Sequence, residues 1–216
     1  MSVHALSDHP SRRGPARGQA ASRRGRRRGP TGAPTRDDLR SDFVALCEID
    51  PAVEALQAPE GPATFAVGDE TVEHLADFEI VRDGVALLVD VVPDADLIRH
   101  PLRTALVGGA VADDGRALVV ETTSSIRAEP RYTTVRLVHE CRRTPVSAGD
   151  RVRILHHLSE TGTAPLIECA GVVQNTRDGV AAVLALAVEG LLTVDIDRPI
   201  LPETPVRRRK LPDPEF

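Results

Sequence analysis

The chain has 216 residues, a formal net charge of −5 and very few aromatic residues, with four Phe, one Tyr and no Trp. This length suffices for one or two domains, whose cores must be built mainly from Val, Leu, Ile and Ala. Three scattered cysteines without CxxC or Cys/His spacing argue against a zinc site or a disulfide framework, and no apolar run reaches the roughly 18 residues that span a bilayer. All but one of the 27 basic residues are Arg, which is typical of a GC-rich bacterial genome. We therefore expect a cytoplasmic bacterial protein without a membrane partner.

Charge is divided unevenly along the chain. Residues 1–36 carry nine arginines against one acid, Asp8, for a net charge of +8, while the remainder carries 18 basic and 31 acidic residues, for −13. The first 36 residues are rich in Gly, Pro, Ser and Arg and lack apolar periodicity, so we expect a disordered basic arm. Basic clusters bind DNA phosphates without sequence preference. The residues expected to contact DNA are Arg23, Arg24, Arg26, Arg27, Arg28, Arg207, Arg208, Arg209 and Lys210.

The segments that follow the arm show clear periodicity. Apolar residues at helical spacing predict a helix over residues 37–48, capped by Thr35 or Asp37. Two short alternating stretches, at residues 64–67 and 71–74, are expected to pair as strands.

Residues 78–93, FEIVRDGVALLVDVVP, predict a β-hairpin, because two apolar runs flank an Asp-Gly pair that favours a positive-φ turn. Asp77 stands at the head of the first strand and Asp90 near the end of the second, so strand pairing should bring the two carboxylates close together. Two acidic oxygen ligands suit a Mg²⁺ ion that assists phosphodiester hydrolysis. A nuclease of this kind also needs a lysine two residues after the second acid, and Val92 occupies that position.

The next segments complete an α/β pattern. Residues 97–113 are mostly apolar over a helical length, interrupted by Gly108-Gly109. A buried strand is predicted at residues 116–121 and a helix at residues 131–141. With the hairpin, these elements indicate a small mixed sheet flanked by helices.

The pattern changes after residues 144–147, which mark an expected boundary. Three further helices are predicted at residues 151–158, 165–173 and 177–190, and a strand follows at residues 191–196. A last helix that enters a strand through a Gly turn favours a winged helix. A small three-helix bundle is the alternative.

Three segments taken in order resemble the TnsA-type transposon endonucleases: DFVALCEIDPAV, ADFEIVRDGVALLVDVVP and ALVVETTSSIRAEPRYTTVRLVHECRR. The resemblance covers about residues 37–200. It implies a PD-(D/E)xK nuclease fold, with a restriction-endonuclease-like mixed sheet flanked by helices, followed by an all-α, winged-helix C-terminal domain. The domains so implied are an arm at 1–36, a nuclease-fold domain at 37–145, a winged-helix-like domain at 146–202 and a basic flexible tail at 203–216.

The resemblance also implies the site residues. The family's helix glutamate corresponds to Arg40, its first acid to Asp77, its second acid to Asp90 and its motif lysine to Val92. The acid expected before the Ile-Arg dipeptide is replaced by Thr123. Asp77 and Asp90 would hold Mg²⁺ in an active enzyme, whereas with Arg40 they would form a structural ion cluster.

The expected function is therefore that of a catalytically impaired, TnsA-like protein that binds DNA or a protein partner, such as a transposase or an AAA-type ATPase. Two alternatives stay open. One is an active Mg²⁺-dependent DNA endonuclease that uses Asp77 and Asp90, and the other is a winged-helix DNA-binding regulator. The histidines show no ligand spacing and are expected to be structural or exposed; those in the body include His74, His100, His139, His156 and His157.

Overall fold

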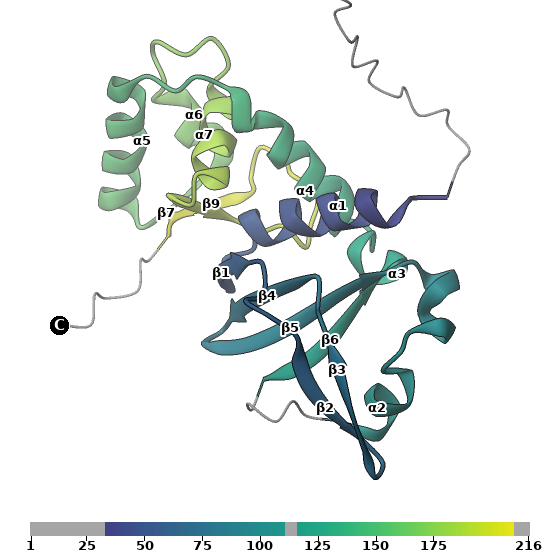
Figure 1. Ribbon diagram of the computed structural model, residues 1–216. Helices are drawn as coiled ribbons and strands as arrows, with labels where there is room; N and C mark the ends of the chain where they lie inside the picture. The colour runs from purple at the N-terminus through teal and green to yellow at the C-terminus, as the bar shows by residue number, and fades with distance from the viewer. Residues whose placement is uncertain (1–32, 111–115, 210–216) are drawn as a thin grey trace, which may run out of the picture. The chain divides into compact units, whose positions relative to one another are not determined.

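The computed structural model describes residues 33–110 and 116–209, and residues 34–216 form one compact unit. Its first part is a mixed α/β assembly in which helices flank a mixed sheet (Figure 1), as the sequence predicts. The elements of this part are α1 (Arg36–Ile49), β1 (Val53–Gln57), β2 (Ala63–Val67), β3 (Glu70–His74), β4 (Phe78–Arg82), β5 (Val85–Val92), the 3₁₀ helix η1 (Asp94–Arg99), α2 (Arg103–Gly108), β6 (Ala117–Thr122), α3 (Thr123–Ile126), α4 (Arg131–Glu140) and the 3₁₀ helix η2 (Cys141–Arg143).

Helix α1 begins with a capping box. The Thr35 hydroxyl accepts a hydrogen bond from the Asp38 amide at 3.3 Å, and the Asp38 carboxylate accepts one from the Thr35 amide at 3.0 Å. This pair satisfies two amides that the first helical turn leaves without partners. The predicted cap at Thr35 is confirmed. Arg36 is already helical and belongs to the compact unit, so the expected arm of residues 1–36 extends too far into the fold.

The central sheet has the order β1-β4-β5-β6, in which β5 runs antiparallel to β4 and parallel to β6. The predicted hairpin is confirmed, and its turn places Asp83 at φ 49° and Gly84 at φ 75°. Helix α1 covers one face of the sheet, where Phe43 packs with Val89 and Val91 in one apolar cluster. The predicted helix over residues 37–48 therefore supplies the core on this face.

The other face of the sheet is covered by the antiparallel β2–β3 hairpin and by α2. Leu88 of β5 packs there with Phe65 of β2 and Leu102. Because successive side chains of a strand point to opposite faces, Asp90 and Val92 share the face of Leu88. The alternation of β5 thus places one carboxylate inside an otherwise apolar layer.

The helix predicted over residues 97–113 is wrong in its extent. The structure has η1 at Asp94–Arg99 and a short α2 at Arg103–Gly108, separated at His100-Pro101. Proline disfavours the helical conformation of the residue before it, which explains the break. Gly109 ends α2 at φ 72°, and residues 111–115 lie outside the described residues.

The second part combines three helices with a small antiparallel sheet of order β7-β9-β8. Its elements are α5 (Ala148–Thr161), β7 (Thr163–Pro165), α6 (Leu166–Gly171), α7 (Gly179–Val188), β8 (Leu192–Val194) and β9 (Pro205–Arg208). Strand β9 falls within the range expected to be a flexible tail, 203–216. Its residue Val206 is fully buried between the two neighbouring strands, which fixes this segment in the fold.

The apolar core continues across the boundary expected at residues 145–146. One cluster of buried side chains joins Leu46 and Ile49 of α1 and Val138 of α4 to Ile154 of α5 and Leu184 of α7. In Figure 1, α1 lies between the sheet and α4. Helix α1 therefore contributes to the cores of both parts, whereas the buried apolar side chains of α4 belong to the cluster shared with the second part.

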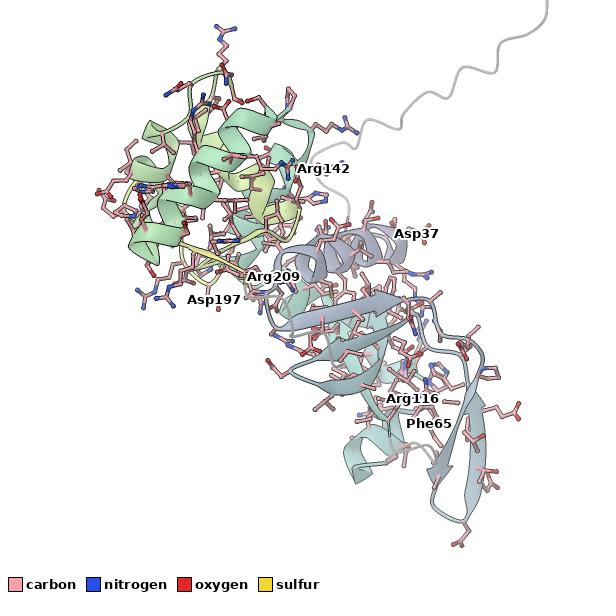
Figure 2. The ribbon with its side chains drawn as sticks, turned by 90° about the vertical axis from the view of Figure 1, so that its left-hand side faces the viewer. Asp37, Phe65, Arg116, Arg142, Asp197 and Arg209 are labelled. Carbon is pink, nitrogen blue, oxygen red and sulfur yellow. The ribbon has the colours of Figure 1, made fainter. Side chains whose placement is uncertain are left out.

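Arg209 adds a polar connection between the same two parts. Its guanidinium donates to the Val53 carbonyl of β1 at 2.8 Å, and the Arg209 side chain is labelled in Figure 2. This hydrogen bond joins the end of β9 to the edge strand of the central sheet. Arg209 is half-buried, so less of it is accessible to DNA than the sequence suggests.

Asp150 holds the start of α5 to the loop that precedes α7. The carboxylate is fully buried and accepts hydrogen bonds from the donors Gln174 N, Asn175 N, Thr176 N, Thr176 Oγ1, Ser147 Oγ and Arg153 Nη1. Burial raises the pKa of Asp150, but the hydrogen bonds from Gln174, Asn175 and the hydroxyls outweigh it, so the pKa lies below its ordinary value. This aspartate is a saturated structural anion.

Candidate functional site

The candidate site is centred on Asp90, near the end of the central strand β5. Its side chain is fully buried, because β5 is flanked by β4 and β6 and covered by the β2–β3 hairpin and α2. Two imidazoles meet this carboxylate. His74 comes from the end of β3, and His100 comes from the break between η1 and α2.

The geometry of this group is compact. His74 Nε2 lies 2.7 Å from Asp90 Oδ2, and His100 Nε2 hydrogen-bonds to the same oxygen. The two imidazole rings are 5.5 Å apart between centroids and lie edge to face. The phenyl ring of Phe65 packs 6.3 Å from the His74 ring and forms part of the apolar surroundings.

Proton positions in the group follow from one further contact. His100 Nδ1 accepts a hydrogen bond from the Leu102 amide at 3.3 Å, which assigns the ring proton to Nε2. His100 therefore donates to Asp90 Oδ2. The other carboxylate oxygen, Asp90 Oδ1, is buried and has no hydrogen-bond partner among the described residues. Native structures leave few buried polar atoms unpaired, and such atoms mark sites that need an explanation.

The other predicted acid, Asp77, has different partners. Its Oδ2 accepts from Arg36 Nη2 at 2.8 Å and from the Val91 amide at 2.8 Å, and its Oδ1 lies 3.6 Å from Arg40 Nε. The ion cluster expected from Arg40 is confirmed for Asp77. Asp90 takes no part in it and binds imidazoles instead.

Val92, which the resemblance aligns with the motif lysine, is 6% exposed and lines a cavity of about 290 Å³. The same cavity is lined by His74 and His100, and by the charged residues Arg36, Asp96 and Arg99. The pocket therefore carries charges of both signs and reaches the imidazoles that bind Asp90.

The Mg²⁺ implied by the resemblance does not fit these residues. Mg²⁺ requires oxygen ligands in near-octahedral geometry. The oxygens of Asp77 are held by two arginines and an amide, and positive charge beside them opposes a further cation. Asp90 offers oxygens, but its nearest partners are ring nitrogens.

The residues that could hold a metal ion are His74, Asp90 and His100. One ligand atom from each lies within 4.8 Å of the others. Imidazole nitrogens with one carboxylate suit Zn²⁺ and related transition metals better than Mg²⁺. The sequence reading missed both histidines, because the three ligands come from three separate elements and share no motif spacing.

The predicted DNA-contacting residues are only partly described. Arg207 and Arg208 are exposed on β9, with Arg207 paired to Thr163 and Thr193 through the backbone. The predictions for Arg23, Arg24, Arg26, Arg27, Arg28 and Lys210 lie outside the described residues.

The comparisons with known proteins add no relative. No family model matches the chain, and no curated protein is detectably similar to it. In residues 33–110 and 116–209, no helix has both the length and the apolar character needed to cross a membrane.

Proposed function

We propose that this chain is a TnsA-like, nuclease-fold protein that binds DNA or a protein partner without hydrolysing phosphodiesters in the presence of Mg²⁺. The observation that carries this proposal is the state of Asp77, which is neutralised by Arg36 and Arg40. The buried Val92 offers no polar group in place of the lysine. Loss of a group that stabilises the transition state lowers the rate about tenfold for each 1.4 kcal/mol.

The topology of the sheet supports the nuclease-like half of the proposal. The hairpin β4–β5 carries one acid before its first strand and one near the end of its second, and a parallel strand, β6, follows on β5. The resemblance places its acids on the same hairpin. The proposal therefore combines a nuclease-like sheet with a site that is not suited to Mg²⁺-dependent hydrolysis.

The order of elements in the second part supports a winged helix. Helix α5, strand β7, helices α6 and α7, and the paired strands β8 and β9 follow one another along the chain. Yet α7, which would be the DNA-reading helix, has the sequence GVAAVLALAV and is buried from Ala182 to Ala187. A helix that is apolar all round belongs to a core, so a regulator that reads bases through α7 is disfavoured.

DNA binding is accordingly assigned to the arginine clusters of the chain. Each phosphate neutralised by an arginine adds about 0.9 to the slope of log affinity against log salt. Arg207 and Arg208 on β9 add a second, smaller cluster. Binding of this kind is sensitive to salt and nearly independent of sequence.

Two measurements test the proposal on the full chain. Supercoiled plasmid incubated with the protein and Mg²⁺ is expected to stay intact, and nicking that disappears in Asp77→Ala would overturn the proposal. For DNA binding, five arginines are replaced together by Gln, and affinity and salt slope are expected to fall together. The positions changed are Arg23, Arg24, Arg26, Arg27 and Arg28.

The matched control for DNA binding is the pair Arg207→Gln and Arg208→Gln, which removes two exposed arginines from β9. It is expected to weaken binding less than the five-site variant. If the five-site variant binds random duplex DNA with unchanged affinity and slope, DNA binding by the arm is excluded.

A further inference from the structure

His74, Asp90 and His100 form a group that neither the nuclease resemblance nor the proposed DNA binding explains. They belong to β3, β5 and the segment between η1 and α2. We propose that they are the ligands of a transition-metal site that takes a Zn²⁺-class ion. This inference goes beyond the proposed function, since it concerns metal binding and not DNA.

Convergence of the ligand atoms is the first argument. Nε2 of both histidines and one carboxylate oxygen of Asp90 lie within 4.8 Å of one another, although the histidines are 16 and 10 residues from Asp90 in sequence. Three elements must fold together to create this group. Two imidazoles with one carboxylate are the ligand set of several catalytic zinc sites, which leave a fourth position open.

The electrostatics of Asp90 supply the second argument. The side chain is fully buried, and within the described part of the chain two imidazoles bind one of its oxygens, while Oδ1 has no hydrogen-bond partner. A buried carboxylate requires a cation or several donors to offset the loss of water. A divalent ion at this position supplies that charge and a partner for the unpaired oxygen.

The adjoining pocket supplies the third argument. Both imidazoles line the cavity of about 290 Å³, so an ion between them has access to solvent or to a small ligand. Arg99 and Asp96 line the same cavity, so its charged groups include both signs.

Coordination changes one hydrogen bond in a predictable way. In the metal-free arrangement His100 carries its proton on Nε2, because Nδ1 accepts from the Leu102 amide. Binding through Nε2 requires the neutral ring to carry its proton on Nδ1 instead. The 3.3 Å contact with Leu102 is then given up, so the Leu102 amide reports on coordination.

Zinc titration of the metal-stripped full chain tests the proposal. Calorimetry is expected to show one Zn²⁺ per chain, with no binding of Mg²⁺ under the same conditions. His74→Gln and Asp90→Asn are each expected to weaken Zn²⁺ binding at least about tenfold. Because His74 is partly exposed, His74→Gln is expected to fold, and it tests the proposal even if Asp90→Asn does not fold.

The matched control is His156→Gln, because His156 is exposed on α5 beside Glu160 and is the kind of surface residue that binds zinc adventitiously. Its affinity is expected to match that of the wild type. The thiols of Cys47 and Cys169 are poor competitors, since burial raises their pKa values to about 12 and about 11. A Co²⁺ spectrum without thiolate charge-transfer bands would agree with ligands that are all nitrogen and oxygen.

Amide NMR adds a readout at the site itself. The Leu102 amide signal is expected to move on addition of Zn²⁺ in the wild type and to stay in place in His74→Gln. The proposal is overturned if Zn²⁺ does not bind, or if binding survives both ligand substitutions and is lost in His156→Gln. Because this binding is measured without DNA, its failure is distinguishable from failure of the proposed DNA-binding function.

Discussion

Asp150 and Asp90 are both completely buried carboxylates, yet the fold treats them in opposite ways. Asp150 accepts hydrogen bonds from three consecutive backbone amides, of residues 174–176, and from two hydroxyls and an arginine. Asp90 has two imidazoles on one oxygen and nothing on the other among the described residues. A structural acid is therefore distinguished from a candidate metal ligand by the number and kind of its hydrogen-bond partners, and not by its burial.

The surroundings of the two acids follow the same division. Asp150 joins the loop at residues 174–176 to the start of α5, and both of its carboxylate oxygens accept hydrogen bonds. The histidines that bind Asp90 line a pocket of about 290 Å³. A saturated anion can be removed only at the expense of stability, whereas an unsaturated one can gain a ligand.

Removal of Asp150 is the largest effect that this comparison predicts. Asp150→Ala leaves several buried donors without an acceptor and is expected to lower the melting temperature by roughly 10 °C. Asp178→Ala, which removes only the N-cap of α7, is the control and is expected to cost about 3 °C. Thermal unfolding followed by circular dichroism measures both, and equal shifts would contradict the structural role of Asp150.

Zinc binding is expected to produce the next largest change in melting temperature, and this change should require Asp90. At a free concentration of 100 times Kd, a bound ion stabilises the folded state by about 2.7 kcal/mol, or roughly 5–10 °C. Asp90→Asn is expected to abolish this upward shift and to change the metal-free melting temperature less than Asp150→Ala does. A zinc-induced shift that persists in Asp90→Asn would remove the contrast between the two acids.

Asp77 offers a smaller test of the same division. Asp77→Ala breaks the ion pairs with Arg36 and Arg40 and the hydrogen bond from the Val91 amide. Because both arginines are largely exposed, the expected loss is about 1–2 kcal/mol, or roughly 4 °C. Zinc affinity, measured in parallel by calorimetry, is expected to stay unchanged, and a large loss of affinity would make Asp77 part of the metal site.

The smallest expected effect is the difference in stability at low pH between the wild type and Asp150→Ala. The pKa of Asp150 is lower in the folded chain than its ordinary 3.8, so the unfolded chain binds a proton more readily. Its stabilising contribution is therefore fully present above pH 3.8 and is lost as the pH falls below that value toward the folded pKa. Between pH 6 and pH 3 the wild type is expected to lose more stability than Asp150→Ala, as measured by urea unfolding, and parallel losses would contradict this.

Much of the fold could be predicted from local sequence. The Asp83-Gly84 pair specified a turn that only positive φ allows, and Thr35 specified the start of α1. The helix expected over residues 97–113 was wrong because Pro101 ended η1 and isolated α2. The local sequence therefore predicted the turn and the helix start correctly. The bounds of the helix expected over residues 97–113 were wrong because of one proline.

The candidate site was predicted only in part. Asp90 was singled out by its position near the end of the second hairpin strand and by the resemblance, and Arg40 was correctly expected to pair with Asp77. His74 and His100 carried no signal, since their meeting depends on the β2–β3 hairpin folding over β5 and on the break before α2. The expectation of no zinc site rested on the spacing of the cysteines and histidines, and spacing along the chain does not detect ligands that come from separate elements.

The most direct test of the contrast between Asp90 and Asp150 is a crystal structure of the full chain soaked in Zn²⁺, with data collected at the zinc absorption edge. The account predicts one anomalous peak about 2.0–2.2 Å from His74 Nε2, His100 Nε2 and an oxygen of Asp90, and none at Asp150. Absence of a peak at Asp90, or a sole peak at His156 on α5, would contradict it.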